Sequence, residues 1–341
     1  MAKSATFQLK NNTNVFIGTE ATMGTAVAQS GLLTELPVTD YSFTEIGAGG
    51  QSLNVAPFRV GGGLTQSNNM VKEQRHDRMY EVSVTFMCTD AAVKRVMLNM
   101  IEDGASGNIS ALIGSMPSTL DFKHNTTNAI PVSLVFRDLS HDADNDIVFR
   151  SCMATSMTFS GDIGSNGGIV MCTAVFQTAY APTANTDVAY NNGSNVTVSA
   201  QQTMFNMHDL SASTATPSGG SAEDLLLFSF ELNIARTVTR VGFDSSSSFD
   251  PMGYALGGYE VTGSLNTKRD GESVTAIAEA TSFALDIDTG VYQILAPTCL
   301  IDSASISFDE DGFKQVIPFR AVYSGATSST IVSFAGAGGD S

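Results

Sequence analysis

The sequence predicts a mainly β protein made of two tandem, related units, each accompanied by one α-helix. Its 341 residues are enough for two domains of ordinary size, and a hydrophobic fraction of 43% can fill two cores. The charged fraction of 15%, the 31 glycines and the absence of Trp favour short strands and turns over long helices. Similar segments also recur in the same order in the two halves, which indicates a duplication.

The repeat is clearest around a shared Tyr-Glu-Val, in RMYEVSVTF (78–86) and GGYEVTGSL (257–265). Three further pairs of segments accompany it in the same order: 41–46 with 228–234, 133–138 with 282–287, and 152–162 with 301–311. Tyr80 and Tyr259 are 179 residues apart, whereas the last two pairs share an offset of 149. The difference predicts extra length in the first unit, between Phe86 and Ser133.

The Tyr-Glu-Val segments alternate as half-buried strands do. In the first unit the apolar face holds Tyr80, Val82, Val84 and Phe86, and the polar face holds Glu81, Ser83 and Thr85. In the second unit Tyr259, Val261 and Leu265 repeat the apolar face, with Gly263 at its third position. Burial on one side predicts an antiparallel sheet with one face in water.

Two hairpins are expected to close the units. Segments 156–176 and 305–322 turn through Gly-rich and Asp-Gly tips, which are typical of β-hairpins. Pro318 lies within the last of these strands and predicts a sheet edge or a bulge there, because proline cannot donate to a ladder.

The extra length of the first unit predicts an amphipathic helix over 89–104. Its apolar positions follow helical spacing, at Val93, Val96, Met97, Met100 and Ile101. Thr89 or Asp90 can cap its start, and Gly104 can end it. A shorter helix is expected over 270–281, with Val274, Ile277 and Ala278 facing inward.

The boundary between the units is expected near residue 182, where a polar, turn-rich stretch (181–195) begins. The predicted domains are therefore 1–182, with the longer helical insertion, and 183–341. The flexible segment 211–221 is interpreted as a loop of the second unit.

Charge and cysteine content exclude several classes of protein. A net charge of −17 and a sequence pI of about 4.4 oppose binding to nucleic acid, which needs clustered Lys and Arg. No segment has the pattern of a signal peptide or a membrane-spanning helix, so we expect a soluble chain made in a cytoplasm. The four cysteines lack paired spacing and are interpreted as buried, reduced thiols, with a structural disulfide or metal site as the alternatives.

No catalytic or cofactor motif is evident, so the sequence predicts neither an enzyme nor a cofactor. The four histidines lack metal-ligand spacing, and the glycine runs 47–50 and 61–63 fit neither a phosphate loop nor a dinucleotide fingerprint. Asp142, Asp144 and Asp146 imitate the start of a calcium loop. Ile147 and Met153 stand where that loop needs Gly and Glu, so a solvated hairpin tip is the preferred interpretation.

A basic loop, 66–79, carries Lys72, Arg75 and Arg78, three of only 17 basic residues. Long loops in compact domains are usually functional or disordered. The hypothesis is that this loop contacts an acidic neighbouring subunit, and the alternative is a merely solvated loop. Under the hypothesis, deleting residues 66–78 leaves a soluble monomer that does not polymerise.

The order of these segments resembles that of the major tail-tube proteins of long-tailed bacteriophages. The resemblance rests on FSFELNIARTVTRVG (228–242) leading through a loop into GGYEVTGSL, and on the opening VFIGTEATMGTAV (15–27). It covers most of the chain. It implies two tandem β-sandwich or barrel domains, each with a flanking α-helix, whose sheets join side by side into a ring around a channel.

Because the chain holds two units, the resemblance favours trimeric rings with pseudo-sixfold symmetry over hexameric ones. It implies further copies of the chain, a tape-measure protein and tail-terminator or baseplate proteins as partners, DNA as passing cargo, no membrane, and a place in the virion tail. The negative charge suits a conduit along which phosphate slides. The alternatives are another phage structural protein, such as a decoration or baseplate component, and an acidic β-rich binding or adhesin-like protein.

Overall fold

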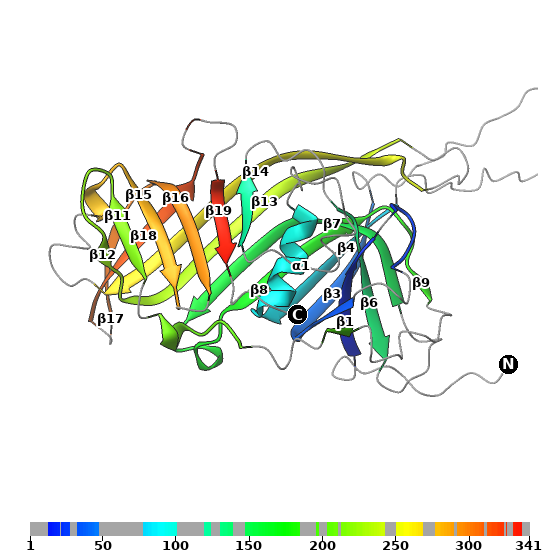
Figure 1. Ribbon diagram of the computed structural model, residues 1–341, viewed down its shortest axis with the longest axis horizontal. Coiled ribbons are helices and arrows are strands. Elements are labelled where there is room, and N and C mark those ends of the chain that lie inside the picture. Colours follow the sequence, from blue (N-terminus) through cyan, green and yellow to red (C-terminus); the bar gives the residue numbers. More distant parts are fainter. Residues whose placement is uncertain are drawn as a thin grey trace, which may run out of the picture.

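The computed structural model describes residues 13–20, 22–27, 33–47, 78–100, 119–123, 130–138, 147–184, 196–197, 203–210, 213–242, 250–268, 277–289, 292–309, 312–323, 325 and 330–335. It is mainly β (Figure 1). The elements up to residue 184 are β1 (Thr13–Thr19), β2 (Leu33–Leu36), β3 (Val38–Gly47), β4 (Arg78–Met87), α1 (Asp90–Met100), β5 (Thr119–Lys123), β6 (Val132–Asp138), β7 (Ile147–Asp162), β8 (Met171–Thr178) and β9 (Thr183–Ala184). They are followed by β10 (Val196–Thr197), β11 (Thr214–Pro217), β12 (Glu223–Asp224), β13 (Leu227–Val241), β14 (Gly253–Lys268), β15 (Ser282–Asp288), β16 (Gln293–Ile301), β17 (Ser305–Asp309), β18 (Gly312–Ala321) and β19 (Thr330–Ala335).

The central feature of the fold is a run of eight antiparallel strands in the order β3-β4-β8-β7-β13-β14-β18-β17. Its first four strands form block 1, and its last four form block 2. The blocks meet where β7 pairs with β13, and Figure 1 shows the long β13–β14 hairpin running beside β7. We call this β7–β13 pairing the internal joint.

The strands around the two blocks repeat the same connections. In the first half β1 pairs with β2 and β6, and β6 pairs with the start of β7. In the second half β11 pairs with β12 and β15, and β15 pairs with β16. The place of the long β7 is taken by β16 and β17 together, since both pair with β18. The pairing pattern therefore repeats as the sequence repeat predicts.

The ladders correct the offset of the last strands. With Tyr80 and Tyr259 as the anchor, Val82 lies opposite Phe176 and its equivalent Val261 lies opposite Ala321, which gives an offset of 145 for β8 and β18. The same offset follows along β7 and β17, where Ser160 corresponds to Ser305. The offset of 149 is wrong for these strands because it matched two phenylalanines by type. The pairing of 41–46 with 228–234 is displaced in the same way, because Phe43 lies opposite Val82 as Ile234 lies opposite Val261. A shift of four residues keeps every side chain on its face, so the burial pattern could not reveal the error.

The alternation predicted for the Tyr-Glu-Val strands is confirmed, since Val82, Val84, Phe86, Val261 and Leu265 are buried. At one equivalent cross-strand pair the larger side chain lies on different strands in the two halves. Val84 faces Ala174 in block 1, whereas Gly263 faces Phe319 in block 2. A Cβ on Gly263 would lie 2.5 Å from Cζ of Phe319, so glycine there makes room for the ring.

Pro318 does not lie on an edge strand, because β18 has neighbours on both sides. On one side Pro318 lies opposite Ser264 of β14. On the other side β18 changes partner from β17 to β16 at this point, between Val316 and Phe319. The missing N–H therefore falls where the ladder is interrupted.

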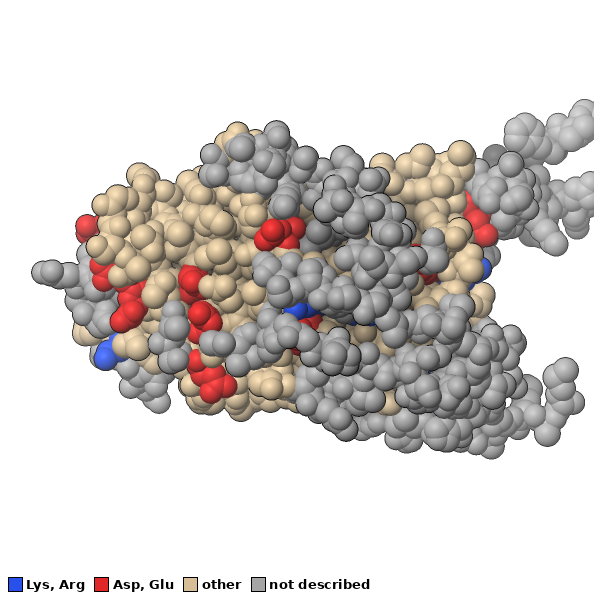
Figure 2. Space-filling model, viewed as in Figure 1, with Lys and Arg blue, Asp and Glu red and all other residues tan. Residues whose placement is uncertain are grey.

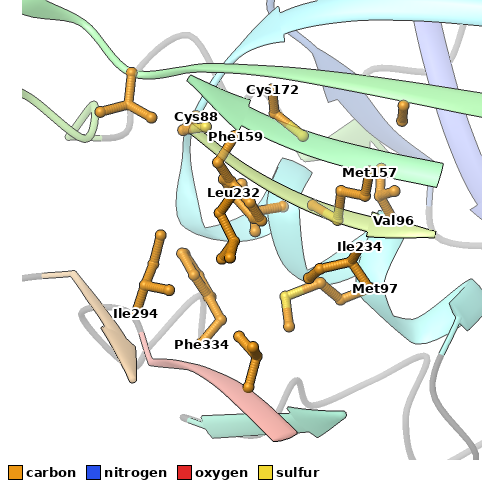
Figure 3. Packing of buried hydrophobic residues seen from close by; sticks show 14 of the residues in the cluster. Cys88, Val96, Met97, Met157, Phe159, Cys172, Leu232, Ile234, Ile294 and Phe334 are labelled. Carbon is orange, nitrogen blue, oxygen red and sulfur yellow. The ribbon is translucent and has the colours of Figure 1, made fainter. Parts of the chain in front are cut away.

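One hydrophobic core extends through both halves. Figure 3 shows Val96 and Met97 of α1 near Ile234 of β13, and Phe159 of β7 near Phe334 of β19. The rings of Phe159 and Phe334 stack with centroids 6.1 Å apart. Because these contacts cross from one half to the other, the halves are packed as one body.

A helix is confirmed over Asp90–Met100 of the predicted range 89–104, and Ile101 and Gly104 lie outside the described residues. The solvent-exposed face expected of an amphipathic helix is not observed in α1. All residues from Ala91 to Met100 are buried. Two of the polar ones have partners within the fold, since Lys94 pairs with Asp90 at 2.7 Å and Nε of Arg95 donates to the Thr34 hydroxyl at 3.2 Å. Of the range 270–281 predicted for a second helix, residues 270–276, including Val274, lie outside the described residues. The structure describes a helical turn at 277–279, with Ile277 buried and Ala278 half-buried. None of the helices in the described ranges has the length and apolar character needed to cross a bilayer.

Candidate functional site

The sequence-predicted site residues fall largely outside the described ranges. Asp142, Asp144 and Asp146 lie in 139–146, and Lys72 and Arg75 lie in 48–77, and neither segment is described. Arg78 begins β4, and its side chain is not described. Within the described ranges, no group of three or more His, Cys, Asp or Glu side chains is placed to hold a metal ion.

The cysteines are confirmed as buried, unbonded thiols at Cys88, Cys152, Cys172 and Cys299. Burial raises the pKa of Cys152 and Cys172 well above the ordinary value, and that of Cys299 to about 12. A thiol with a raised pKa carries little thiolate, which is the nucleophilic form. These cysteines are core residues, and the features that stand out lie along the eight-stranded sheet instead.

The internal joint is a ladder of seven residue pairs, from Ser229 opposite Asp162 to Ala235 opposite Ser156. On its core side, Leu232 and Ile234 of β13 lie opposite Phe159 and Met157 of β7. All four side chains are buried, so the joint excludes water as an ordinary sheet interior does.

On the other side of the sheet a row of polar side chains crosses the joint. The following residues lie opposite one another in turn: Asp40, Thr85, Thr173, Thr158, Asn233 and Thr262. The Thr85 and Thr173 hydroxyls are 2.9 Å apart, and the Thr158 hydroxyl donates to Oδ1 of Asn233 at 3.0 Å. This face therefore continues unbroken from block 1 to block 2 as a surface of hydroxyl and amide groups.

Close packing beside the joint depends on Gly161. A Cβ at this residue would lie 2.6 Å from Sδ of Met207 and 2.7 Å from Cε1 of Phe230. Phe230 also packs on Phe205, with ring centroids 6.3 Å apart. The segment 203–210 thus covers the end of the β7–β8 hairpin, and glycine admits the ring of Phe230.

A buried arginine fastens the two halves together. Arg236 of β13 donates from Nη1 to the Met100 carbonyl at 2.9 Å, from Nη2 to the Asn99 carbonyl at 2.9 Å and from Nε to the Ala154 carbonyl at 3.1 Å. Two of these carbonyls end helix α1, where a positive charge is favoured by the helix dipole. Burial lowers the pKa of Arg236, while the neighbouring Tyr259 opposes that shift. The Tyr259 hydroxyl donates to the same Met100 carbonyl.

A second connection runs through β5. This strand belongs to the extra length of the first half, and it pairs with the C-terminal strand β19, which pairs with β16. The insertion therefore adds a strand to the sheet of the other half.

The ends of the eight-stranded sheet differ from the joint. Strand β3 pairs with β4, and β17 pairs with β18, and no described strand pairs with the other side of either. We call β3 and β17 the outer edges. Large apolar side chains are exposed along them, with Phe43 45% exposed and Ile306 53% exposed.

A buried carboxylate shapes the bend at which β7 passes from β6 to β8. Oε1 of Glu20 accepts from the Ser133 hydroxyl and the Ser151 amide at 2.6 Å each, and Oε2 accepts from the Ser151 hydroxyl at 2.6 Å. Ser151 has φ of 48°, a conformation that costs energy for a residue with a side chain. Desolvation raises the pKa of Glu20, although these hydrogen bonds oppose the shift.

Sequence comparison supplies no relative, since neither a protein-family model nor a curated protein sequence matches this chain. The geometry of the sheet is therefore the basis for the functional assignment.

Sequence reasoning missed the internal joint, although one signal was present. Arg236 occupies the apolar face of an alternating strand, in line with Phe230, Leu232 and Ile234. A basic residue in such a row indicates a buried hydrogen-bonding partner. The partner itself, the end of a helix more than a hundred residues earlier, is set by the tertiary structure.

Proposed function

We propose that this chain is the structural subunit of a bacteriophage tail tube, which assembles into stacked rings around a channel that conducts DNA. The observation that carries the proposal is the repeated pairing pattern, with two equivalent blocks joined edge to edge inside one chain. A surface that joins its own repeat can also join the repeat of another copy. Head-to-tail contacts of this kind close into rings when the rotation permits.

The outer edges are the equivalents of the two strands that meet in the internal joint. Strand β3 corresponds to β13 and β17 corresponds to the end of β7, so each edge offers what the joint already uses. Exposed sheet edges pair readily with other strands. Three copies would supply six blocks, which agrees with the trimeric ring that the sequence resemblance implies.

The charge of the chain supports a channel for DNA. The net charge is −17, and Figure 2 shows Asp and Glu in several patches over the end of the molecule that carries β11, β12 and β15, with few Lys and Arg. The polar face of the eight-stranded sheet carries Glu81, Glu231 and Glu260 among hydroxyl and amide groups. The cations on this face lie toward its β18 end, where Lys268 is opposite Lys314 and Arg320 is opposite Thr262. Within the described parts of β3, β4, β8, β7 and β13 the polar face presents no Lys or Arg that would hold phosphate.

The partners follow from the same proposal. Copies of the chain form the tube, and the resemblance adds a tape-measure protein and tail-terminator or baseplate proteins in the virion. DNA is passing cargo in this scheme, and the chain performs no catalysis.

Negative-stain electron microscopy of purified protein and of particles tests the proposal. The expected result is stacked rings with a central channel wide enough for duplex DNA, and averaged end views with three copies in each ring. Isolated globules at high protein concentration, or particles whose tails lack this chain, would contradict it.

A further inference from the structure

We infer that copies associate through β17 of one and β3 of the next in the register of the internal joint, and that Glu45 makes this contact the weaker one. The inference rests on the proposed function, since it concerns how one ring block meets another. It concerns the position at which a positive charge in the internal joint is replaced by a negative charge between copies.

The register follows from the ladders. In the internal joint Glu231 of β13 lies opposite Ser160 of β7. Glu231 lies opposite Ser264, and Asp40 lies opposite Thr85. Ser264 and Thr85 are equivalent, because they are 179 residues apart, as Tyr259 and Tyr80 are. Asp40 is therefore the equivalent of Glu231. Ser305 is the equivalent of Ser160. The contact between copies therefore places Asp40 of one copy opposite Ser305 of the next.

The side chains beside this pair are complementary in size. Gly161 faces Phe230 in the internal joint. Their equivalents are Ile306 and Val38, because Val38 lies opposite Phe86 as Phe230 lies opposite Leu265. The large residue has moved to the other strand, so the volume between the strands is filled in both cases. Ile306 is 53% exposed in the isolated chain and would be covered by a second copy.

The tip of the same hairpin shows a similar difference in exposure between the two blocks. Gly168, in block 1, would place a Cβ 2.7 Å from the His208 ring, so segment 203–210 covers it. Its equivalent at the offset of 145 is Phe313, which is 60% exposed. Phe313 is thus far more exposed than the buried Gly168 that it replaces, and a second copy is the occupant that the repeat specifies.

The charge at one position separates the two joints. Arg236 lies opposite Tyr259, and Glu45 lies opposite Tyr80, so Glu45 takes the place of Arg236. In the internal joint Arg236 donates to the carbonyls that end α1. Between copies, Glu45 would approach the helical turn 277–279, which precedes β15 as α1 precedes β6. A carboxylate donates no hydrogen bond, so Glu45 cannot replace the contacts that Arg236 makes, and its negative charge is repelled by carbonyl oxygens.

This difference gives the two joints different roles. The internal joint closes within the folded chain, whereas the joint between copies needs a further contribution, such as the stacking of one ring on another. Free copies are then held apart until assembly begins.

Sedimentation velocity of the full chain tests the inference through a charge reversal. Glu45→Arg restores the side chain of the internal joint, and it is expected to lower the concentration at half-association by about tenfold or more. Glu45→Lys serves as a second variant, with a smaller shift in the same direction. Glu260→Arg is the matched control, because it makes the same charge change at an exposed residue away from the outer edges. Glu260 lies on the polar face of β14, which pairs with β13 inside the sheet.

The following outcomes decide the matter. Unchanged association for Glu45→Arg and Glu45→Lys, both folded by circular dichroism, overturns the inference, as does an equal shift for Glu260→Arg. Adding Ile306→Asp to Glu45→Arg is expected to restore the monomer, and persistent association would exclude the β17 edge. If particles carry tubes of this chain while Glu45→Arg has no effect, the proposed function stands and this inference falls. If Glu45→Arg associates only into open chains, the inferred contact between copies is supported and the proposed function as a tail tube is contradicted.

Discussion

Strands β13 and β3 occupy equivalent places in the two blocks, yet one lies inside the sheet and the other at its edge. Ile234 of β13 is fully buried, whereas Phe43, which takes its place in β3, is 45% exposed. Two positions further along, β13 has the buried Arg236 and β3 has Glu45. The comparison teaches that a duplicated strand keeps its pairing pattern while its side chains adapt to whether the neighbour is in the same chain.

The same contrast holds at the other side of each joint. Gly161 of β7 is packed under Phe230 and Met207, and its equivalent Ile306 of β17 is exposed. Strand β7 is therefore covered by residues of its own chain, whereas we infer that β17 is covered by a second copy. The predictions below change one member of an equivalent pair at a time, beginning with the largest effect.

The size exchange between the blocks gives the largest effect. Phe319→Ala is expected to lower the free energy of unfolding by about 4 kcal/mol, because it leaves a cavity. Gly263→Val is expected to lower it by about 2 kcal/mol, because the new Cβ would lie 2.5 Å from Cζ of Phe319 and 2.7 Å from the Glu231 carbonyl oxygen, and only the first overlap is relieved when the ring is removed. The double variant recreates the Val84–Ala174 pair of block 1. It is expected to cost at least about 1 kcal/mol less than the sum of the single changes, as measured by urea denaturation. Strict additivity would contradict the equivalence of these pairs.

The arginine contact comes next. Arg236→Ala is expected to lower the free energy of unfolding by about 3 kcal/mol, because the Asn99 and Ala154 carbonyls lose the Arg236 donor and the Met100 carbonyl keeps only the Tyr259 hydroxyl. Glu45→Ala, at the equivalent position, should change it by less than about 0.5 kcal/mol. Denaturant titrations of the two variants measure the contrast, and similar losses for both would show that the internal joint is not special.

The two tyrosines of the repeat offer a smaller contrast. Tyr259→Phe removes the hydroxyl that donates to the Met100 carbonyl, with an expected loss of about 1 kcal/mol. Tyr80 contacts Phe149 through its ring, with centroids 6.4 Å apart, so Tyr80→Phe should be nearly neutral. Thermal unfolding distinguishes them, and a larger loss for Tyr80→Phe would refute the assignment.

The smallest effect is a dependence on pH that resides in the first half. Burial raises the pKa of Glu20 above its ordinary value of 4.5, so the folded chain holds this proton more tightly than the unfolded chain. The resulting stabilisation is present below pH 4.5 and is lost as the pH rises through the raised pKa. Relative to Glu20→Gln, the wild-type protein should therefore lose stability as the pH increases over this window. A difference between the two proteins that is constant with pH would contradict this cause.

Sequence periodicity was sufficient for the strands and for the order of the repeat. Val82, Val84 and Phe86 alternate with polar residues, and this local pattern follows directly from a sheet with one buried face. Helix α1 was predicted from its spacing, but the burial of Lys94, Arg95 and Asn99 was not. Their partners come from other elements, and no local pattern identifies them.

The strand register and the long-range strand pairings could not be predicted from the sequence for a related reason. A ladder shifted by four residues has the same faces, so matching Phe159 with Phe308 was as consistent with the pattern as the observed register. The pairing of β5 with β19 joins segments about two hundred residues apart in the chain. The contact residues proposed in the basic loop, Lys72 and Arg75, lie outside the described ranges and stay a prediction.

The central claim is that the outer edges pair as the internal joint does, and engineered cysteines test it most directly. Asp40→Cys combined with Ser305→Cys places one thiol on each outer edge, opposite each other in the inferred register. Residues opposite in antiparallel strands lie within the distance that a disulfide spans. Ser160→Cys with Glu231→Cys is the internal control, because these residues lie opposite each other within the chain.

Oxidation of assembled protein, followed by electrophoresis without reductant, gives the readout. The account predicts covalent links between copies for the Asp40/Ser305 pair, in a ladder that ends at three copies. Ser42→Cys with Ser305→Cys, two residues out of register, should link poorly. Monomers alone from the Asp40/Ser305 pair, while the Ser160/Glu231 pair closes its bond within the chain, would contradict the account.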